Sequence, residues 1–233
     1  MKRLLATLVW DVRLQYRNGF YAAAAVVAVI GAALLFRFDK DLQAYSLPVI
    51  FLQNLAVNAF YFIGALVLLE KDEGTLSARV ITPLRKEEFL ASKVLSLTGL
   101  SLLESAVLAA LIYGIRLNWA ALLSGVALLA VMLALYGFLV VARYDSLNAY
   151  LMPSVLYLLI LMPPLLDYFG VLKGAWVYLH PVHGPLVLLQ AAFRPVAAWQ
   201  WVYGLLYSGL WIGLLWRWAR RDFYRYIIEG AGA

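Results

Sequence analysis

Six long apolar segments, separated by short charged clusters, dominate this chain of 233 residues. A helix needs about 20 mostly apolar residues to cross the hydrocarbon core of a bilayer. Hydrophobic residues make up 65% of the chain and charged residues 14%, whereas a soluble domain has about 45–50% and about 25%. We therefore expect a membrane protein whose six spans lie at about 20–36, 47–69, 94–115, 120–142, 149–169 and 199–216.

The apolar segments indicate helices rather than strands. Strands that cross a bilayer alternate apolar and polar residues with period two, and none of the six segments does so. A lipid environment then leaves helices, because their backbone hydrogen bonds are satisfied within the segment. The predicted fold class is an all-α integral membrane protein, with one transmembrane domain over residues 1–233.

The distribution of lysine and arginine predicts the orientation. With six spans, 14 of the 19 basic residues fall on the side that carries both termini and the loops 70–93 and 143–148. Cytoplasmic loops carry the excess of basic residues, so both termini are expected in the cytoplasm. The net charge of +6 is then explained by topology and by contact with anionic lipid headgroups, and we expect no nucleic-acid partner.

Two further segments are predicted to lie at the membrane without spanning it. Residues 1–18 have the pattern of an amphipathic helix on the cytoplasmic surface, although an ordinary charged flank of the first span would have a similar composition. Residues 170–198 are apolar but interrupted by prolines and glycines. They predict a re-entrant helical segment before the last span, with a flat interfacial loop as the alternative.

The loop 70–93 is the longest polar segment of the chain. Thr75 is placed to cap a short helix, and Pro83 is placed to end it. A connection between two spans needs far fewer residues, so we expect this loop to bind another protein, with a simple connector as the alternative.

The chain lacks the sequence patterns of common catalytic sites. It contains no Walker A sequence, no His-Glu-x-x-His and no Gly-x-Ser-x-Gly. Its only histidines are His180 and His183, and they have no acidic neighbour that would complete a metal site. We expect no catalytic residues, no metal site and no enzyme activity in this chain.

Polar residues inside predicted spans are candidates for a transport path, because burying them in lipid is costly. Asn54, Asn58 and Tyr61 follow helical spacing in the second span, and the third span contains a deep carboxylate, Glu104. The alternative is hydrogen bonding that only holds helices together. The predicted pathway-lining residues are Asn54, Asn58, Tyr61, Ser101 and Glu104. A transporter driven by an ion gradient through Glu104 is the alternative function.

Several short motifs of the loop, taken together, resemble a known family. Glu70 to Leu76 reads Glu-Lys-Asp-Glu-Gly-Thr-Leu, and Thr82-Pro83-Leu84, Glu88-Phe89-Leu90 and Lys93 follow it. This series resembles the signature of ABC-2 type transporter permeases. The loop at 145–148 and the pair His180-Pro181 are most similar to the bacterial drug-export permeases, including the fluoroquinolone export group.

The resemblance implies the membrane subunit of an ATP-driven exporter in a bacterial or archaeal cytoplasmic membrane. Such permeases pair, here as a homodimer with a heterodimer as the alternative. Each binds a separate P-loop ATPase that holds ATP and magnesium, so this chain needs no cofactor. The cargo would be apolar or amphiphilic, drug-like or lipid-like, and moved by alternating access. The loop would bind the ATPase as a coupling helix, through Glu70, Glu73, Gly74, Thr75, Leu76, Arg79 and Pro83.

Overall fold

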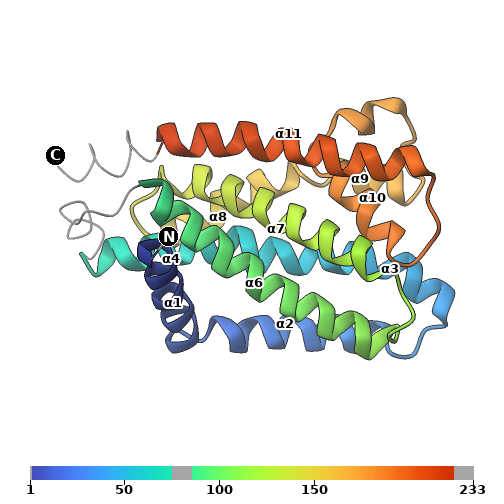
Figure 1. The fold of residues 1–233 in the computed structure, drawn as a ribbon, viewed down its shortest axis with the longest axis horizontal. Coiled ribbons are helices and arrows are strands. Elements are labelled where there is room, and N and C mark those ends of the chain that lie inside the picture. The colour runs from blue at the N-terminus through green and yellow to red at the C-terminus, as the bar shows by residue number, and fades with distance from the viewer. Residues whose placement is uncertain (1, 75–85, 223–233) are drawn as a thin grey trace.

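The computed structural model describes residues 2–74 and 86–222, and all regular elements in this part of the chain are helices. The longer helices lie side by side along one direction (Figure 1). In chain order they are α1 Lys2–Arg17, α2 Phe20–Leu35, α3 Lys40–Leu55, the π-helix η1 Ala56–Tyr61, α4 Phe62–Asp72, α6 Lys86–Ile112, α7 Trp119–Val141, α8 Leu147–Leu159, α9 Pro163–Tyr168, the 3₁₀-helix η2 Ala175–Leu179, α10 His183–Ala191 and α11 Ala198–Asp222.

The predicted N-terminal helix is present as α1. It is bent by 64° from α2, and the turn between them contains Gly19 with a φ of 75°. In Figure 1, α1 runs across the direction of the bundle. Asp11, Leu14 and Gln15 form its buried face, which packs on α6. Its place on a membrane surface stays a prediction.

The predicted second span is longer than its apolar run. A continuous helical segment extends from Lys40 to Asp72, 33 residues, and contains the predicted span 47–69. At 1.5 Å per residue the segment is about 50 Å long, more than the hydrocarbon core of a bilayer. Asp39 caps its start by accepting a hydrogen bond from the Leu42 amide (2.8 Å).

Length and hydropathy qualify three single helices as spans within residues 2–74 and 86–222: Lys40–Asp72, Glu87–Ile112 and Trp119–Val141. The bent pair of α1 and α2 qualifies as a fourth. The other two predicted spans differ from their apolar runs. The run 149–169 is divided into the 13-residue α8 and the short α9, which begins at Pro163. The last, α11, has 25 residues, but its tryptophans and tyrosines lower its hydropathy.

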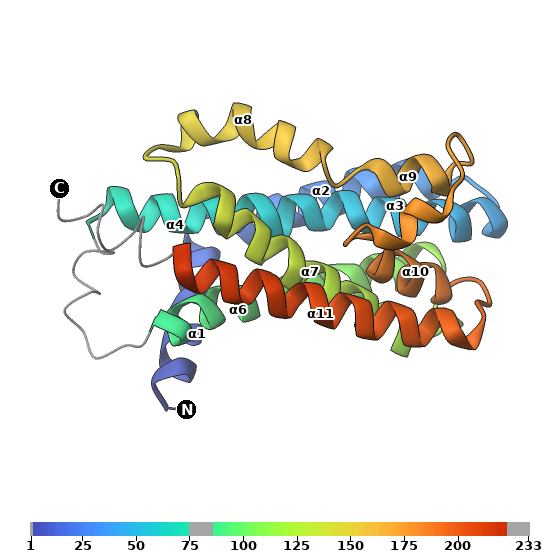
Figure 2. The same ribbon diagram turned by 90° about the horizontal axis from the view of Figure 1, so that it is seen from above.

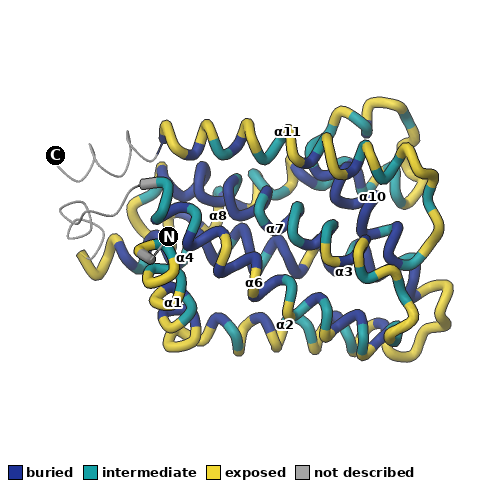
Figure 3. The backbone as a smooth tube through the Cα atoms, viewed as in Figure 1, coloured by how far each residue is buried: buried dark blue, intermediate teal, exposed yellow. Residues whose placement is uncertain are grey.

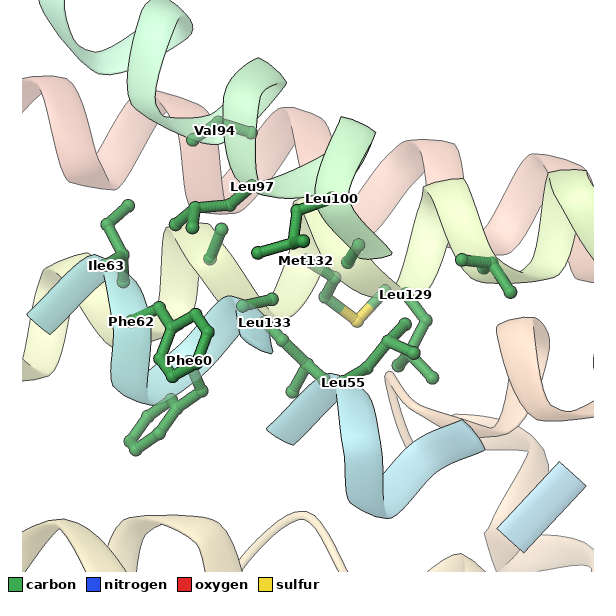
Figure 4. Close-up of a cluster of buried hydrophobic side chains, with 14 of the residues drawn as sticks. Leu55, Phe60, Phe62, Ile63, Val94, Leu97, Leu100, Leu129, Met132 and Leu133 are labelled. Carbon is green, nitrogen blue, oxygen red and sulfur yellow. The ribbon is translucent and has the colours of Figure 1, made fainter. Parts of the chain in front are cut away.

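The helix α7 is the centre of the bundle. It packs against α6, α10, α11, α4 and η1, and Figure 3 shows it mostly buried while α2 and α11 are largely exposed. Figure 4 shows the core where the segment from α3 to α4 meets α6 and α7, with Leu55, Phe60, Leu97 and Leu133 among the side chains that fill it. In Figure 2, α8 lies along one edge of the bundle.

A glycine allows α7 to approach η1 closely. A Cβ atom added at Gly137 would lie 2.6 Å from the Phe60 carbonyl oxygen, which is backbone and has little freedom to move. The same carbonyl accepts a hydrogen bond from the Tyr150 hydroxyl of α8 (3.2 Å). The π-helix is therefore held from two sides.

Candidate functional site

A buried ion cluster joins three helices at the end of the bundle where α4 ends and α6 begins (Figure 1). Lys93 of α6 places its Nζ atom 2.9 Å from Glu70 Oε1 and 3.2 Å from Asp11 Oδ1. All three side chains are at most 1% exposed. The cluster connects α1 to α4 and α6, the two helices that precede and follow residues 75–85.

Neighbouring polar groups extend this cluster. Ser92 Oγ donates a hydrogen bond to Asp11 Oδ2, and Gln15 Nε2 donates to Ser96 Oγ (2.7 Å). Lys93 Nζ also lies 4.7 Å from the centre of the Phe89 ring. A buried charge is tolerated when it is paired and hydrogen-bonded. Loss of one partner would leave the others uncompensated, so the three helices are expected to move together at this end.

Glu70 has a different place from the one expected of an ATPase contact. The sequence predicted it on the coupling surface, but its carboxylate is turned into the protein towards Lys93. The apolar neighbours of Glu70 on α4 direct this side of the helix to the core. In this structure its side chain positions α4 and α6 and presents no surface to a partner.

Glu73 and Gly74 do lie at the surface, at the end of α4. Gly74 ends the helix with a φ of 66°, a left-handed conformation that favours glycine. Glu73 lies 3.9 Å from the Arg17 guanidinium at the end of α1. The other predicted coupling residues, Thr75, Leu76, Arg79 and Pro83, fall outside the described residues.

Two exposed ion pairs surround the same end of the bundle. Lys71 of α4 contacts Asp145 (2.5 Å), and Arg220 of α11 contacts Glu87 of α6 (2.8 Å). Exposed pairs contribute little stability, about 0–1 kcal/mol each. They nevertheless add two charged contacts at the edge of the predicted binding surface, one between α6 and α11 and one between α4 and the connection from α7 to α8.

A second polar cluster lies inside the bundle, around the middle of α6. Asn54 Nδ2 donates to Glu104 Oε1 (3.1 Å), and Asn58 Nδ2 donates to Glu104 Oε2. Asn54 is 3% exposed and Asn58 is fully buried. The structure thus brings together three of the five residues predicted to line a path. Because the amides hold both carboxylate oxygens, the contacts agree with either role, transport path or helix packing.

The remaining two predicted lining residues do not join this cluster. Tyr61 was expected on the face of Asn54 and Asn58, but the π-helix intervenes, and its i→i+5 hydrogen bonds shift the residues that follow around the helix axis. Tyr61 instead packs against Tyr150, with ring centres 6.2 Å apart. Ser101 is fully buried, and its hydroxyl has no hydrogen bond within the part of the chain that is described.

The opposite end of the bundle is closed by contacts of α9, η2 and α10. Tyr45 and Tyr168 exchange hydrogen bonds, each hydroxyl donating to the other's carbonyl (3.0 and 2.5 Å). His180 Nε2 lies 3.0 Å from the Ile160 carbonyl oxygen, and His183 Nδ1 lies 3.2 Å from the Tyr203 hydroxyl. Burial lowers the pKa of His180, which favours its neutral form. Through these contacts with Ile160 and Tyr203, the two histidines connect residues 180–183 to the end of α8 and to α11.

Residues 2–74 and 86–222 contain no group of three or more His, Cys, Asp or Glu side chains arranged to hold a metal ion. The acidic residues named above instead contact lysine, arginine, asparagine or serine.

Some residues of the ion cluster were not among the predicted site residues. Asp11 and Ser92 were not selected, and Lys93 entered only as part of the family motif. The sequence offered one local indication that Asp11 and Lys93 are buried: each lies close in the chain to apolar residues that are expected to be buried. Their pairing depends on how α1 packs on α6, about 80 residues away in the chain, and no local pattern reports that contact.

Comparison with known proteins identifies the family of this chain. The family model of the fluoroquinolones export permease protein family matches residues 2–231. The chain is 33% identical, over its full length and 99% of theirs, to the fluoroquinolones export permease proteins of Mycobacterium tuberculosis strains CDC 1551 / Oshkosh and ATCC 25618 / H37Rv. These matches confirm the resemblance to an ABC-2 type drug-export permease that the loop motifs indicated. The chain belongs to the fluoroquinolones export permease protein family.

Proposed function

We propose that this protein is the membrane subunit of an ATP-driven exporter that removes drug-like or lipid-like amphiphiles from the cytoplasm or the inner leaflet. The match to the export permease family over residues 2–231 carries the proposal. The relatives in Mycobacterium tuberculosis are named for fluoroquinolones, so a fluoroquinolone is the first cargo to test.

The energy source is proposed to be a separate P-loop ATPase that binds ATP and magnesium. The sequence itself has no Walker A motif, so ATP hydrolysis needs another chain. We propose that the loop between α4 and α6 binds this ATPase, with Glu73 and Gly74 at the edge of the contact. A cytoplasmic position of this end and of both termini is part of the proposal, as are six spans in a bacterial or archaeal cytoplasmic membrane.

The buried ion cluster supplies a route for mechanical coupling in this proposal. A force on the loop reaches α4 through Glu70 and α6 through Lys93, and Asp11 passes it to α1. Because unpairing buried charges is costly, the three helix ends would shift as one unit. Two copies of the permease, proposed as a homodimer, would then alternate their access between the two sides of the membrane.

The first test is mild-detergent purification of the tagged chain from its native membranes, followed by mass spectrometry. The proposal expects a stoichiometric P-loop ATPase that is lost in Glu73→Lys. The matched control is Asp41→Lys, a charge reversal at the exposed opposite end, which should retain the ATPase. A preparation without an ATPase that transports in liposomes on an ion gradient alone would reject the proposal.

A further inference from the structure

An apolar pocket of about 260 Å³ lies between α2 and α6. Ala24, Ala28 and Ala32 line it from α2, and Leu103, Val107 and Leu111 line it from α6. The alanines are one helical turn apart, so their small side chains leave space along one face of α2. The three α6 residues are exposed, at 50–70%, so the pocket opens on the side of the bundle.

Glu104 is the only charged residue among those that line the pocket. Its two oxygens accept hydrogen bonds from Asn54 and Asn58, which approach from α3 and η1. The amide donors are neutral, so they supply no counter-charge to this carboxylate. None of the ion pairs in the described part of the chain includes Glu104.

The pocket therefore combines an apolar wall with one carboxylate that takes part in none of the ion pairs of the described residues. A charge in such surroundings is costly unless a counter-charge accompanies it. Lys93, on the same helix, is eleven residues away, or about 16 Å along the axis, and it is already paired with Glu70 and Asp11. A bound cation would stabilise the ionised form of this carboxylate.

We propose that this pocket binds a monocationic amphiphile, with its apolar ring system between α2 and α6 and its protonated amine paired with Glu104. The proposal rests on the proposed export function and specifies the substrate class. A lipid acyl chain or an apolar helix would fill the space but would leave the carboxylate unpaired, and an anion would be repelled by it. The lateral opening gives a hydrophobic amine access from the membrane.

The test measures binding to the purified full chain in lipid nanodiscs, without an ATPase. The probes are tritiated 1-phenylpiperazine, which is cationic at pH 7, and its neutral N-acetyl derivative, with binding to empty nanodiscs subtracted. The wild type should bind the cation at least about tenfold more tightly than the neutral analogue. Glu104→Gln, which keeps the side-chain shape, should bind the two equally. Asp41→Asn, which removes an exposed carboxylate, should keep the preference.

A second variant addresses the pocket itself. Ala28→Phe fills the space and leaves the carboxylate in place, so it should abolish saturable binding of both probes. Equal binding of the probes by the wild type, a preference that survives in Glu104→Gln, or saturable binding by a folded Ala28→Phe would overturn the proposal. Because the assay needs no ATPase, those results would leave the export proposal standing. Cation binding without ATP-dependent transport in the reconstituted complex would instead reject export.

Discussion

The carboxylate of Glu70 lies 2.9 Å from the ammonium of Lys93, and both side chains are almost completely buried. The two residues flank the loop in which most of the predicted ATPase-coupling residues lie. Their ion pair therefore joins the end of α4 to the start of α6 inside the protein. Asp11 of α1 contacts the same ammonium, so a loop that was predicted as a docking surface is also the point where three helices are joined.

Removal of the shared cation should destabilise the protein strongly. Lys93→Met leaves the carboxylates of Asp11 and Glu70 buried without their ammonium, and we expect the free energy of unfolding to fall by about 3–5 kcal/mol. Lys71→Met is the matched control, because its pair with Asp145 is exposed and should contribute at most about 1 kcal/mol. Denaturant unfolding in detergent measures both, and equal losses would contradict the assigned role of the cluster.

Charge reversal should distinguish the roles of Glu70 and Glu73, the two acidic residues at this end of the bundle. Glu73→Lys changes an exposed side chain, so we expect normal folding and a loss of ATP-dependent export. Glu70→Lys places a second cation beside Lys93 in the interior and should reduce the yield of folded protein. Size-exclusion chromatography and transport in vesicles distinguish the outcomes. Normal export by Glu73→Lys would count against docking at this loop.

The contact of Asn58 with Glu104 should appear as a coupling energy. Asn58→Leu removes a donor from a carboxylate in the bundle, and a loss of about 1–3 kcal/mol in unfolding free energy is expected. In Glu104→Leu the acceptor is absent, so adding Asn58→Leu should cost less there. A double-mutant cycle of thermal unfolding measures this difference, and strictly additive losses would argue that the two groups do not interact.

Gly137→Ala should disturb the packing of α7 on the π-helix. The new methyl group would lie 2.6 Å from the Phe60 carbonyl oxygen, and we expect a loss of about 1–3 kcal/mol from the forced separation of the two helices. Gly99→Ala is the matched control, because an added Cβ atom there meets open space and improves helix propensity by up to about 1 kcal/mol. Unfolding midpoints that fall equally would refute the close approach.

The number and direction of spans can be tested by cysteine labelling, because the natural chain contains no cysteine. Single variants at the exposed Arg143, Arg116 and Lys173 place one thiol in each of three connections. With six spans and cytoplasmic termini, a membrane-impermeant maleimide added to whole cells should label Arg116→Cys and Lys173→Cys but spare Arg143→Cys until the membrane is opened. The reverse pattern would invert the predicted topology.

Much of the fold follows from local properties of the sequence. Apolar runs separated by charged residues predicted membrane-spanning segments, because the hydropathy of a segment is calculated from consecutive residues. They predicted helices, because in lipid the backbone hydrogen bonds have to be satisfied within the segment. The loop motifs likewise predicted the family, which the comparisons confirmed. The π-helix was not predicted, because α and π segments have the same composition and differ only in hydrogen-bond register. Tyr61, the last residue of the π-helix, packs against Tyr150.

The sequence by itself thus determined the helical membrane class, the presence of an N-terminal helix, the family and the candidates Asn54, Asn58 and Glu104. Only the tertiary structure decided that Glu70 lies inside with Lys93 and Asp11, and that Glu104 borders a pocket between α2 and α6. The physical reason is the range of the interactions. The hydropathy of a segment depends only on residues that are close in the chain. The partners of the buried Lys93 are instead 23 and 82 positions away in the chain, and helix packing brings them together.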